Sequence, residues 1–216
     1  MGSGPWLTMH EHGRLGPMEW AKAGRPLPSE HTSGDRGIAV DIDGAAALFG
    51  VVDGLGHGPD AAAAAVRAVN TVRGAGSERL EVLVQQCHRV LAGTRGVAMT
   101  LARVDFATNT LEWTGVGNVT ADLLAKAPTG VQVRSSARLT AGIVGYRIPE
   151  IRQAQVLPIR TGDLVVISTD GIAEHFLNHI DFAAPAVVIA EELLSKDAKE
   201  TDDAMVLVAR HRGALP

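Results

Sequence analysis

Apolar runs bounded by turn residues predict most of the secondary structure of this chain. Ile38 to Val40 and Ala46 to Val52 flank Asp43-Gly44, and an Asp-Gly pair between apolar runs favours a type I′ hairpin. Short apolar runs separated by turn signals predict further strands at 20–23, 97–106, 110–117, 119–126, 131–135, 151–159, 164–169 and 204–210.

Two helices are expected between the hairpin and these later strands. Pro59 and Asp60 suit the first turn of an Ala-rich helix, which the Gly-rich residues 74–77 end. Apolar residues recur at helical spacing over 80–91. A short helix is expected after Gly171 and another over 184–195. Because strands and helices do not alternate strictly, the order favours α+β, with antiparallel sheets and helices packed outside.

Composition narrows the possible functions. The 216 residues suit one domain, and we expect residues 20–216 to form it, with the aperiodic residues 1–19 as a flexible arm. A net charge of −4 and 4% aromatic residues argue against nucleic-acid binding. A single cysteine, Cys87, fits a reducing cytoplasm, and no segment is long and apolar enough to cross a membrane.

Aspartates at the ends of apolar segments are the main chemical signal. They are Asp35 in SGD, Asp53 in VVDGLGHG, Asp170 in STDGIAE and Asp202 in TDDAMVLV. Carboxylates gathered at buried strand ends repel one another, and a bound cation relieves that repulsion. Gly54 lets the backbone approach such an ion, so its carbonyl can also be a ligand. Oxygen ligands favour Mg²⁺ or Mn²⁺ over zinc.

Simpler interpretations compete with a metal centre. Asp-Gly pairs form turns, and Asp43-Gly44 is expected to do only that, because no glutamate closes a calcium loop after it. His175 and His179 have the i, i+4 spacing of zinc ligands but lack the HExxH glutamate, so zinc is not expected. GLGHG resembles a dinucleotide-binding loop, but Pro59 occupies the third glycine position and no Walker lysine is present.

The motifs VVDGLGHG, STDGIAE and DDAMVLV, in this order, resemble the metal-dependent protein phosphatases of type 2C (PPM). The resemblance runs from about Ser33 to Ala209 and is strongest to the bacterial SpoIIE/RsbU-like branch. The compact length and the stretch CHRVLAGTRGVAMTLARVDFATNTLEWTGVGNV also resemble RsbX-type stressosome phosphatases within that branch.

The resemblance implies a four-layer αββα sandwich of two antiparallel sheets flanked by helices. It also implies two Mn²⁺ (or Mg²⁺) ions that hydrolyse phosphoserine or phosphothreonine through a metal-bridging water. The metal ligands, and so the catalytic residues, would be Asp53, Asp170 and Asp202, together with the Gly54 carbonyl. Asp35 would help to bind the metals through water. Asp203, Glu174 and His57 would be supporting groups. The implied substrates are phosphorylated stressosome scaffold (STAS-domain) or anti-sigma pathway proteins, as negative feedback.

Three departures from the family pattern qualify this expectation. Met205 stands where Thr or Ser is usual, and Leu55 stands where larger relatives have a histidine proposed as general acid. His57 could protonate the leaving group, although a role in capping the following helix is favoured. No arginine clearly matches the phosphate-binding arginine, and Arg36 is expected to be solvated. A catalytically silent binding module of the same fold is the alternative, with Met205 as its only motif-level hint.

Overall fold

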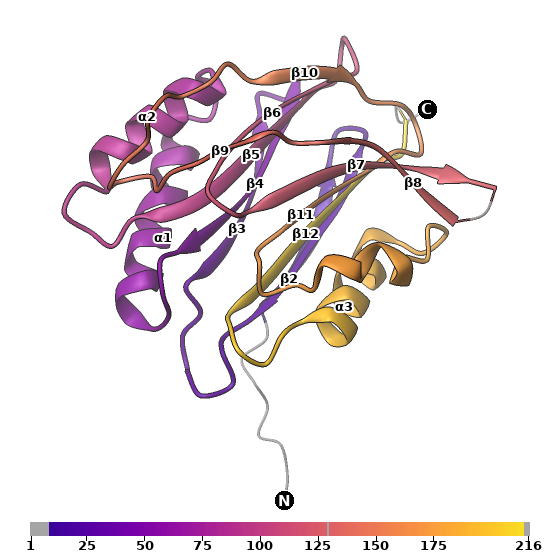
Figure 1. The fold of residues 1–216 in the computed structure, drawn as a ribbon. Helices are drawn as coiled ribbons and strands as arrows, with labels where there is room; N and C mark the ends of the chain where they lie inside the picture. Colours follow the sequence, from indigo (N-terminus) through magenta and orange to yellow (C-terminus); the bar gives the residue numbers. More distant parts are fainter. Residues whose placement is uncertain (1–8, 129, 214–216) are drawn as a thin grey trace, which may run out of the picture.

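Two six-stranded sheets lie face to face at the centre of the structure, a computed structural model that describes residues 9–128 and 130–213 (Figure 1). Sheet A has the order β1 (Met9–Leu15), β2 (Met18–Arg25), β12 (Ala204–His211), β11 (Leu164–Ser168), β7 (Thr120–Ala127) and β8 (Gly130–Ser136). Sheet B has the order β10 (Gln155–Pro158), β6 (Thr110–Val116), β5 (Val97–Asp105), β4 (Ala46–Gly54) and β3 (Asp35–Ile42), and β9 (Leu139–Thr140) pairs with β6. Only the β6–β9 pair is parallel among these described strands.

Helices cover the outer face of each sheet. The helices α1 (Pro59–Gly74) and α2 (Leu80–Val90) pack on sheet B, whereas the 3₁₀ helix η1 (Glu174–His179) and α3 (Ala186–Asp197) pack on sheet A (Figure 1). The buried side of α1 is mostly alanine, which allows the helix to approach the sheet closely. This arrangement confirms the expected α+β fold with four αββα layers.

Apolar side chains on alternate sides of the strands build three core layers. In β12, Leu207 faces the other sheet, whereas Val206 and Val208 face α3. In β4, Phe49 and Val51 point between the sheets, and the neighbouring Leu48 points toward the α1 and α2 layer. Both strands are therefore buried on two faces, and their ends are held firmly in place.

The predicted hairpin between β3 and β4 is confirmed. Asp43 and Gly44 both have positive φ angles, 53° and 67°, as a type I′ turn requires. The Ala45 N–H donates to the Ile42 carbonyl at 2.9 Å. This Asp-Gly pair is thus a turn, as expected.

The expected flexible arm over residues 1–19 is wrong for residues 9–19. Residues 9–15 form β1, which pairs along its length with β2, and residues 1–8 lie outside the described part of the chain. Glu11 lies opposite Lys22, and their side chains form an ion pair at 2.6 Å. The strand lacks apolar alternation because it is a largely exposed edge strand. The strand expected over 151–159 is also shorter, since only β10 forms.

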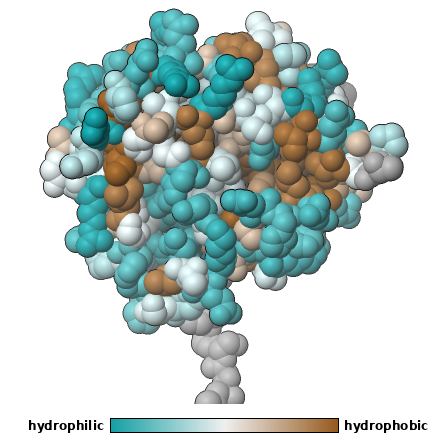
Figure 2. All heavy atoms as spheres, in the orientation of Figure 1, coloured by the Kyte–Doolittle hydropathy of each residue, from teal (hydrophilic) through white to brown (hydrophobic). Residues whose placement is uncertain are grey.

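The surface in the orientation of Figure 1 is mixed. Figure 2 shows hydrophilic residues over most of this face, with hydrophobic residues in separate areas. Within the described residues, every helix is too short or too polar to cross a lipid bilayer.

Candidate metal centre

Strand ends from both sheets bring the predicted aspartates together. Asp35 begins β3 and lies directly opposite Asp53 near the end of β4. Asp170 follows β11, and Asp202 precedes β12, the antiparallel neighbour of β11. The carboxylates from both sheets are close enough to shift one another's pKa values. The structure therefore gathers every aspartate that the sequence singled out as a candidate ligand.

The two Asp-Gly motifs of the centre are more than turn formers: Asp53-Gly54 ends β4, and Asp170-Gly171 lies in a turn in which the Ile172 N–H donates to the Thr169 carbonyl at 3.1 Å. A Cβ on Gly54 would lie 2.2 Å from the Ala61 carbonyl oxygen, and one on Gly171 would lie 1.8 Å from the Asp203 carbonyl oxygen. Neither glycine has a positive φ angle. Glycine is required at both places because another backbone segment packs directly against it. This separates Gly54 and Gly171 from Gly44, whose positive φ angle serves a turn.

Asp35 is the most deeply buried carboxylate of the group, with 1% of its surface exposed. Burial raises the pKa of Asp35 well above its ordinary range, and the charge of Asp53 raises it further. The Thr169 hydroxyl donates to Asp35 Oδ2 at 2.8 Å and accepts from the Met205 N–H at 3.0 Å. Thr169 thus links β12 of sheet A to β3 of sheet B at the site.

Burial, together with the negative charges of Asp170 and Asp202, raises the pKa of Asp53 to about 7. Burial also raises the pKa of Asp202. Such repulsion would be relieved by a cation, which favours the ionised form of every carboxylate around it. Because the available donors are carboxylate and carbonyl oxygens, the group fits a hard cation such as Mg²⁺ or Mn²⁺.

The carboxylate of Asp203 holds a neighbouring loop, unlike that of Asp202. Its Oδ1 accepts from the Leu27 N–H at 2.7 Å, and its Oδ2 accepts from the Gly34 N–H at 2.6 Å. Both oxygens therefore hold the loop that leads into β3. The Gly34 carbonyl in turn accepts from the Gly54 N–H at 3.2 Å, so Asp203 supports the geometry of the neighbouring strand ends.

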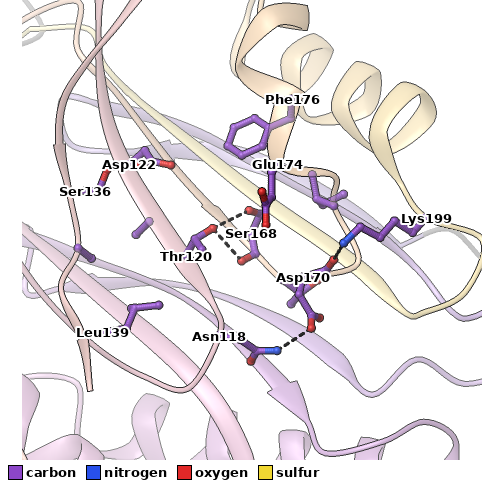
Figure 3. A pocket seen from close by; sticks show the side chains of 14 residues that line it. Asn118, Thr120, Asp122, Ser136, Leu139, Ser168, Asp170, Glu174, Phe176 and Lys199 are labelled. Atoms are coloured by element: carbon purple, nitrogen blue, oxygen red, sulfur yellow. Dashed lines mark hydrogen bonds between the residues drawn. The ribbon is translucent and has the colours of Figure 1, made fainter. Parts of the chain in front are cut away.

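Asp170 is exposed at the mouth of the site. The Asn118 side-chain amide donates to Asp170 Oδ2 at 2.7 Å, and Lys199 Nζ donates to the Asp170 backbone carbonyl at 2.6 Å (Figure 3). Sequence reasoning missed Thr169, Asn118 and Lys199 as site residues. The available signals were the position of Thr169 directly before Asp170 and the VGNV motif around Asn118.

A pocket of about 450 Å³ opens beside Asp170. Figure 3 shows Glu174 and Phe176 from η1 on one side of it, with Asp122, Ser136 and Leu139 on the other. Glu174 thus lines the same pocket as Asp170, near the position expected for a supporting acidic group.

Two expectations about side chains near the centre are wrong. His57 does not cap α1, because Gly58 is the N-cap residue and makes no side-chain cap; His57 Nδ1 instead lies 2.7 Å from Glu30 Oε1. Burial raises the pKa of Asp202, and the ring is close enough to that carboxyl to offset part of the rise. Arg36 is half-buried rather than solvated, and its guanidinium donates to the carbonyls of Ser33 and Asp35.

Comparison with known proteins gives one family match by sequence. Residues 43–212, more than half of the 216-residue chain, match the family described as Stage II sporulation protein E (SpoIIE). No curated protein matches the chain significantly.

Solved structures share the fold over most of the chain. One, described as "The bacterial stressosome: a modular system that has been adapted to control secondary messenger signaling", is 30% identical, covers 89% of this chain and 99% of its own, and has a TM-score of 0.79. The crystal structure of RsbX in complex with magnesium is 19% identical, covers 94% and 99%, and has a TM-score of 0.77. The PP2C phosphatase domain of SpoIIE from Bacillus subtilis, solved with a fragment of its regulatory domain, is 15% identical, covers 97% and 70%, and has a TM-score of 0.73.

The family match and these structural similarities agree with the order of the aspartate motifs and with the four-layer fold. The chain belongs to the SpoIIE family, in the SpoIIE/RsbU-like branch of the metal-dependent PP2C-type phosphatases.

Proposed function

We propose that this chain is a Mn²⁺- or Mg²⁺-dependent protein serine/threonine phosphatase whose metals are held by Asp53, Asp170 and Asp202. The observation that carries the proposal is the convergence of these carboxylates from two sheets, and burial together with the charges of Asp170 and Asp202 raises the pKa of Asp53 to about 7. A folded protein tolerates such repulsion where function needs it. Divalent cations would relieve this repulsion when they bind, and the relief would favour their binding.

The chain's own residues would hold and orient the reacting groups. Asp53, the Gly54 carbonyl, Asp170 and Asp202 would bind two cations, and Asp35 would act through water. When bound, the cations supply an activated water and offset the charge that develops on the phosphoryl group. Asn118 fixes the Asp170 carboxylate, and Thr169 fixes that of Asp35. The leaving oxygen would take its proton from solvent or from His57, which Glu30 holds near Asp202.

The pocket beside Asp170 would receive residues next to the phosphorylated side chain. It combines the apolar Phe176 and Leu139 with the polar Ser136 and the charged Lys199 and Glu174, so it suits a peptide of mixed character. Similarity to RsbX and to a stressosome structure supports phosphorylated STAS-domain stressosome scaffold proteins, or anti-sigma pathway proteins, as the substrates. In that role the enzyme would provide negative feedback.

Met205 gives little support to a catalytically silent binding module. Its side chain is 1% exposed and belongs to the core between the sheets. A Cβ on Gly24 would lie 2.4 Å from the Met205 methyl carbon, so this methionine fills the space above a glycine. Its backbone N–H still donates to Thr169. The departure therefore affects packing and leaves the candidate ligands in place.

Substitution of Asp53 tests the activity directly. Asp53→Asn should lower phosphate release by roughly 100-fold or more, because it removes a proposed metal ligand. Asp43→Asn, in the β3–β4 turn, is the matched control and should keep full activity. Release would be measured from phosphorylated STAS-domain scaffold proteins and from an aryl phosphate, with Mn²⁺, with Mg²⁺ and with chelator.

The outcomes test the enzymatic activity, the substrate and the metal site separately. Metal-dependent release from the aryl phosphate alone would keep the enzyme and remove the stressosome substrate. Equal activity of Asp53→Asn and Asp43→Asn would contradict the site, and no hydrolysis of either substrate would favour the binding module.

Replacement of Thr169 tests the support of Asp35. Thr169→Val removes the hydroxyl that serves both Asp35 and the Met205 N–H, so Mn²⁺ affinity should fall by roughly 10- to 100-fold. Thr169→Ser keeps the hydroxyl and should retain most of the affinity. Titration calorimetry with Mn²⁺ measures both. If Thr169→Val bound Mn²⁺ as tightly as Thr169→Ser, the hydrogen bond would have no part in metal binding.

The stability of the metal-free protein should fall as the pH rises from about 4 to about 7. The pKa of Asp53 goes from 3.8 to about 7 on folding, so the folded state binds more protons than the unfolded state in this range. Deprotonation therefore favours unfolding. Asp53→Asn should reduce the slope without abolishing it, because the pKa values of Asp35 and Asp202 are raised as well. Urea denaturation with chelator at a series of pH values would measure the slope. A slope in Asp53→Asn equal to that of the unsubstituted protein would exclude Asp53 as its source.

A further inference from the structure

A second group of metal-binding side chains lies on the outer side of sheet A. It consists of His175 and His179 from η1 and Asp197 from the last turn of α3. His179 Nδ1 lies 2.7 Å from Asp197 Oδ1, and His175 Nε2 lies 3.5 Å from the same oxygen. One ligand atom from each residue can be chosen so that all three lie within 4.8 Å of one another. The two imidazole rings stand edge to face, with centroids 5.5 Å apart.

Asp197 is the buried member of this group and is incompletely paired. Its side chain is fully buried, and Oδ2 has no hydrogen-bond partner among the described residues. The neighbouring Lys196 pairs with Glu192 instead, and the ion pairs of Asp197 in the described chain involve only the two histidines. A buried carboxylate oxygen without a donor is costly. A cation bound to this carboxylate would compensate its buried charge.

We propose that His175, His179 and Asp197 form a separate binding site for a borderline divalent cation such as Zn²⁺. Two imidazole nitrogens and one carboxylate oxygen are a zinc donor set, in contrast to the all-oxygen donors of the aspartate centre. Ligand atoms around tetrahedral zinc lie roughly 3.3 Å apart, given bonds of about 2.0–2.1 Å. The separations of 2.7 and 3.5 Å fit after small side-chain shifts. His175 is 64% exposed, so the fourth position faces solvent.

This site goes beyond the phosphatase function, and it departs from the expectation, based on the sequence, that zinc does not bind here. That expectation rested on the absence of the HExxH glutamate, which is a general base on the same helix as the two histidines. The third donor comes instead from α3, 18 residues after His179 in the chain.

The proposed site would join two segments that carry ligands of the aspartate centre. The Ala173 N–H donates to the Asp197 carbonyl at 2.8 Å, and the Lys199 N–H donates to the Gly171 carbonyl at 2.8 Å. Figure 1 shows α3 and the short helix before it side by side on sheet A. A cation bound to both would fix η1, and with it Glu174 and Phe176 in the wall of the pocket. The site is thus structural, and it shares no side chain with the aspartate centre.

Zinc binding to the full-length chain tests this site. The titration would be done by calorimetry in excess Mg²⁺, which is intended to fill the proposed aspartate centre. The unsubstituted chain should bind Zn²⁺ at one site, and His175→Gln and His179→Gln should each weaken that binding by roughly 10-fold or more. His12→Gln, at an exposed histidine of β1, is the matched control and should bind like the unsubstituted chain. Equal affinity of His175→Gln and His12→Gln would overturn the proposal, as would an absence of zinc binding by the unsubstituted chain.

A second variant and a second readout keep this result separate from the phosphatase proposal. Asp53→Asn should retain the zinc site, because Asp53 is no part of it. Zn²⁺ should raise the thermal unfolding temperature of Asp53→Asn and of His12→Gln, but not that of His175→Gln. Loss of zinc binding in Asp53→Asn with retention in His175→Gln would assign the ion to the aspartate centre and overturn the second site.

Discussion

Repulsion among the carboxylates gathered where the two sheets meet is the constraint on which the rest of this structure depends. The backbone pairing of β3 with β4 sets Asp35 directly opposite Asp53, and the β11–β12 pair brings Asp170 and Asp202 to the same end. Removal from water already disfavours the charges of Asp35 and Asp53, and the proximity of the other carboxylates adds to the cost. The fold must therefore supply enough packing energy elsewhere to hold them together without a cation.

That energy comes from strands buried on both faces and from close backbone packing at the site. Sheet-to-sheet contacts and two helical layers fix β4 and β12 along their lengths. Gly54 and Gly171 let the Ala61 and Asp203 segments pack directly against the strand ends. Thr169 and Asp203 then form hydrogen bonds that connect the two sheets at the site. The carboxylates are consequently preorganised, which is what tight binding of a small, hard cation requires.

Local patterns in the sequence predict the strands, the hairpin and the positions of Asp53, Asp170 and Asp202, because each depends on residues close by in the chain. Long-range contacts could not be predicted in this way. Thr169 meets Asp35 across 134 residues, and His57 pairs with Glu30 where a helix cap was expected. β1 has no apolar alternation, since pairing with β2 rather than burial holds it. Asp197 likewise reaches its histidines only through the packing of α3 on η1.

The central claim is that the aspartates at the sheet junction bind divalent cations, and anomalous diffraction from crystals soaked in Mn²⁺ tests it most directly. The account predicts anomalous peaks between the carboxylates of Asp53, Asp170 and Asp202, with the Gly54 carbonyl within coordination distance. Peaks only elsewhere, such as at the Asp43 turn, or none at a Mn²⁺ concentration that supports catalysis, would contradict it.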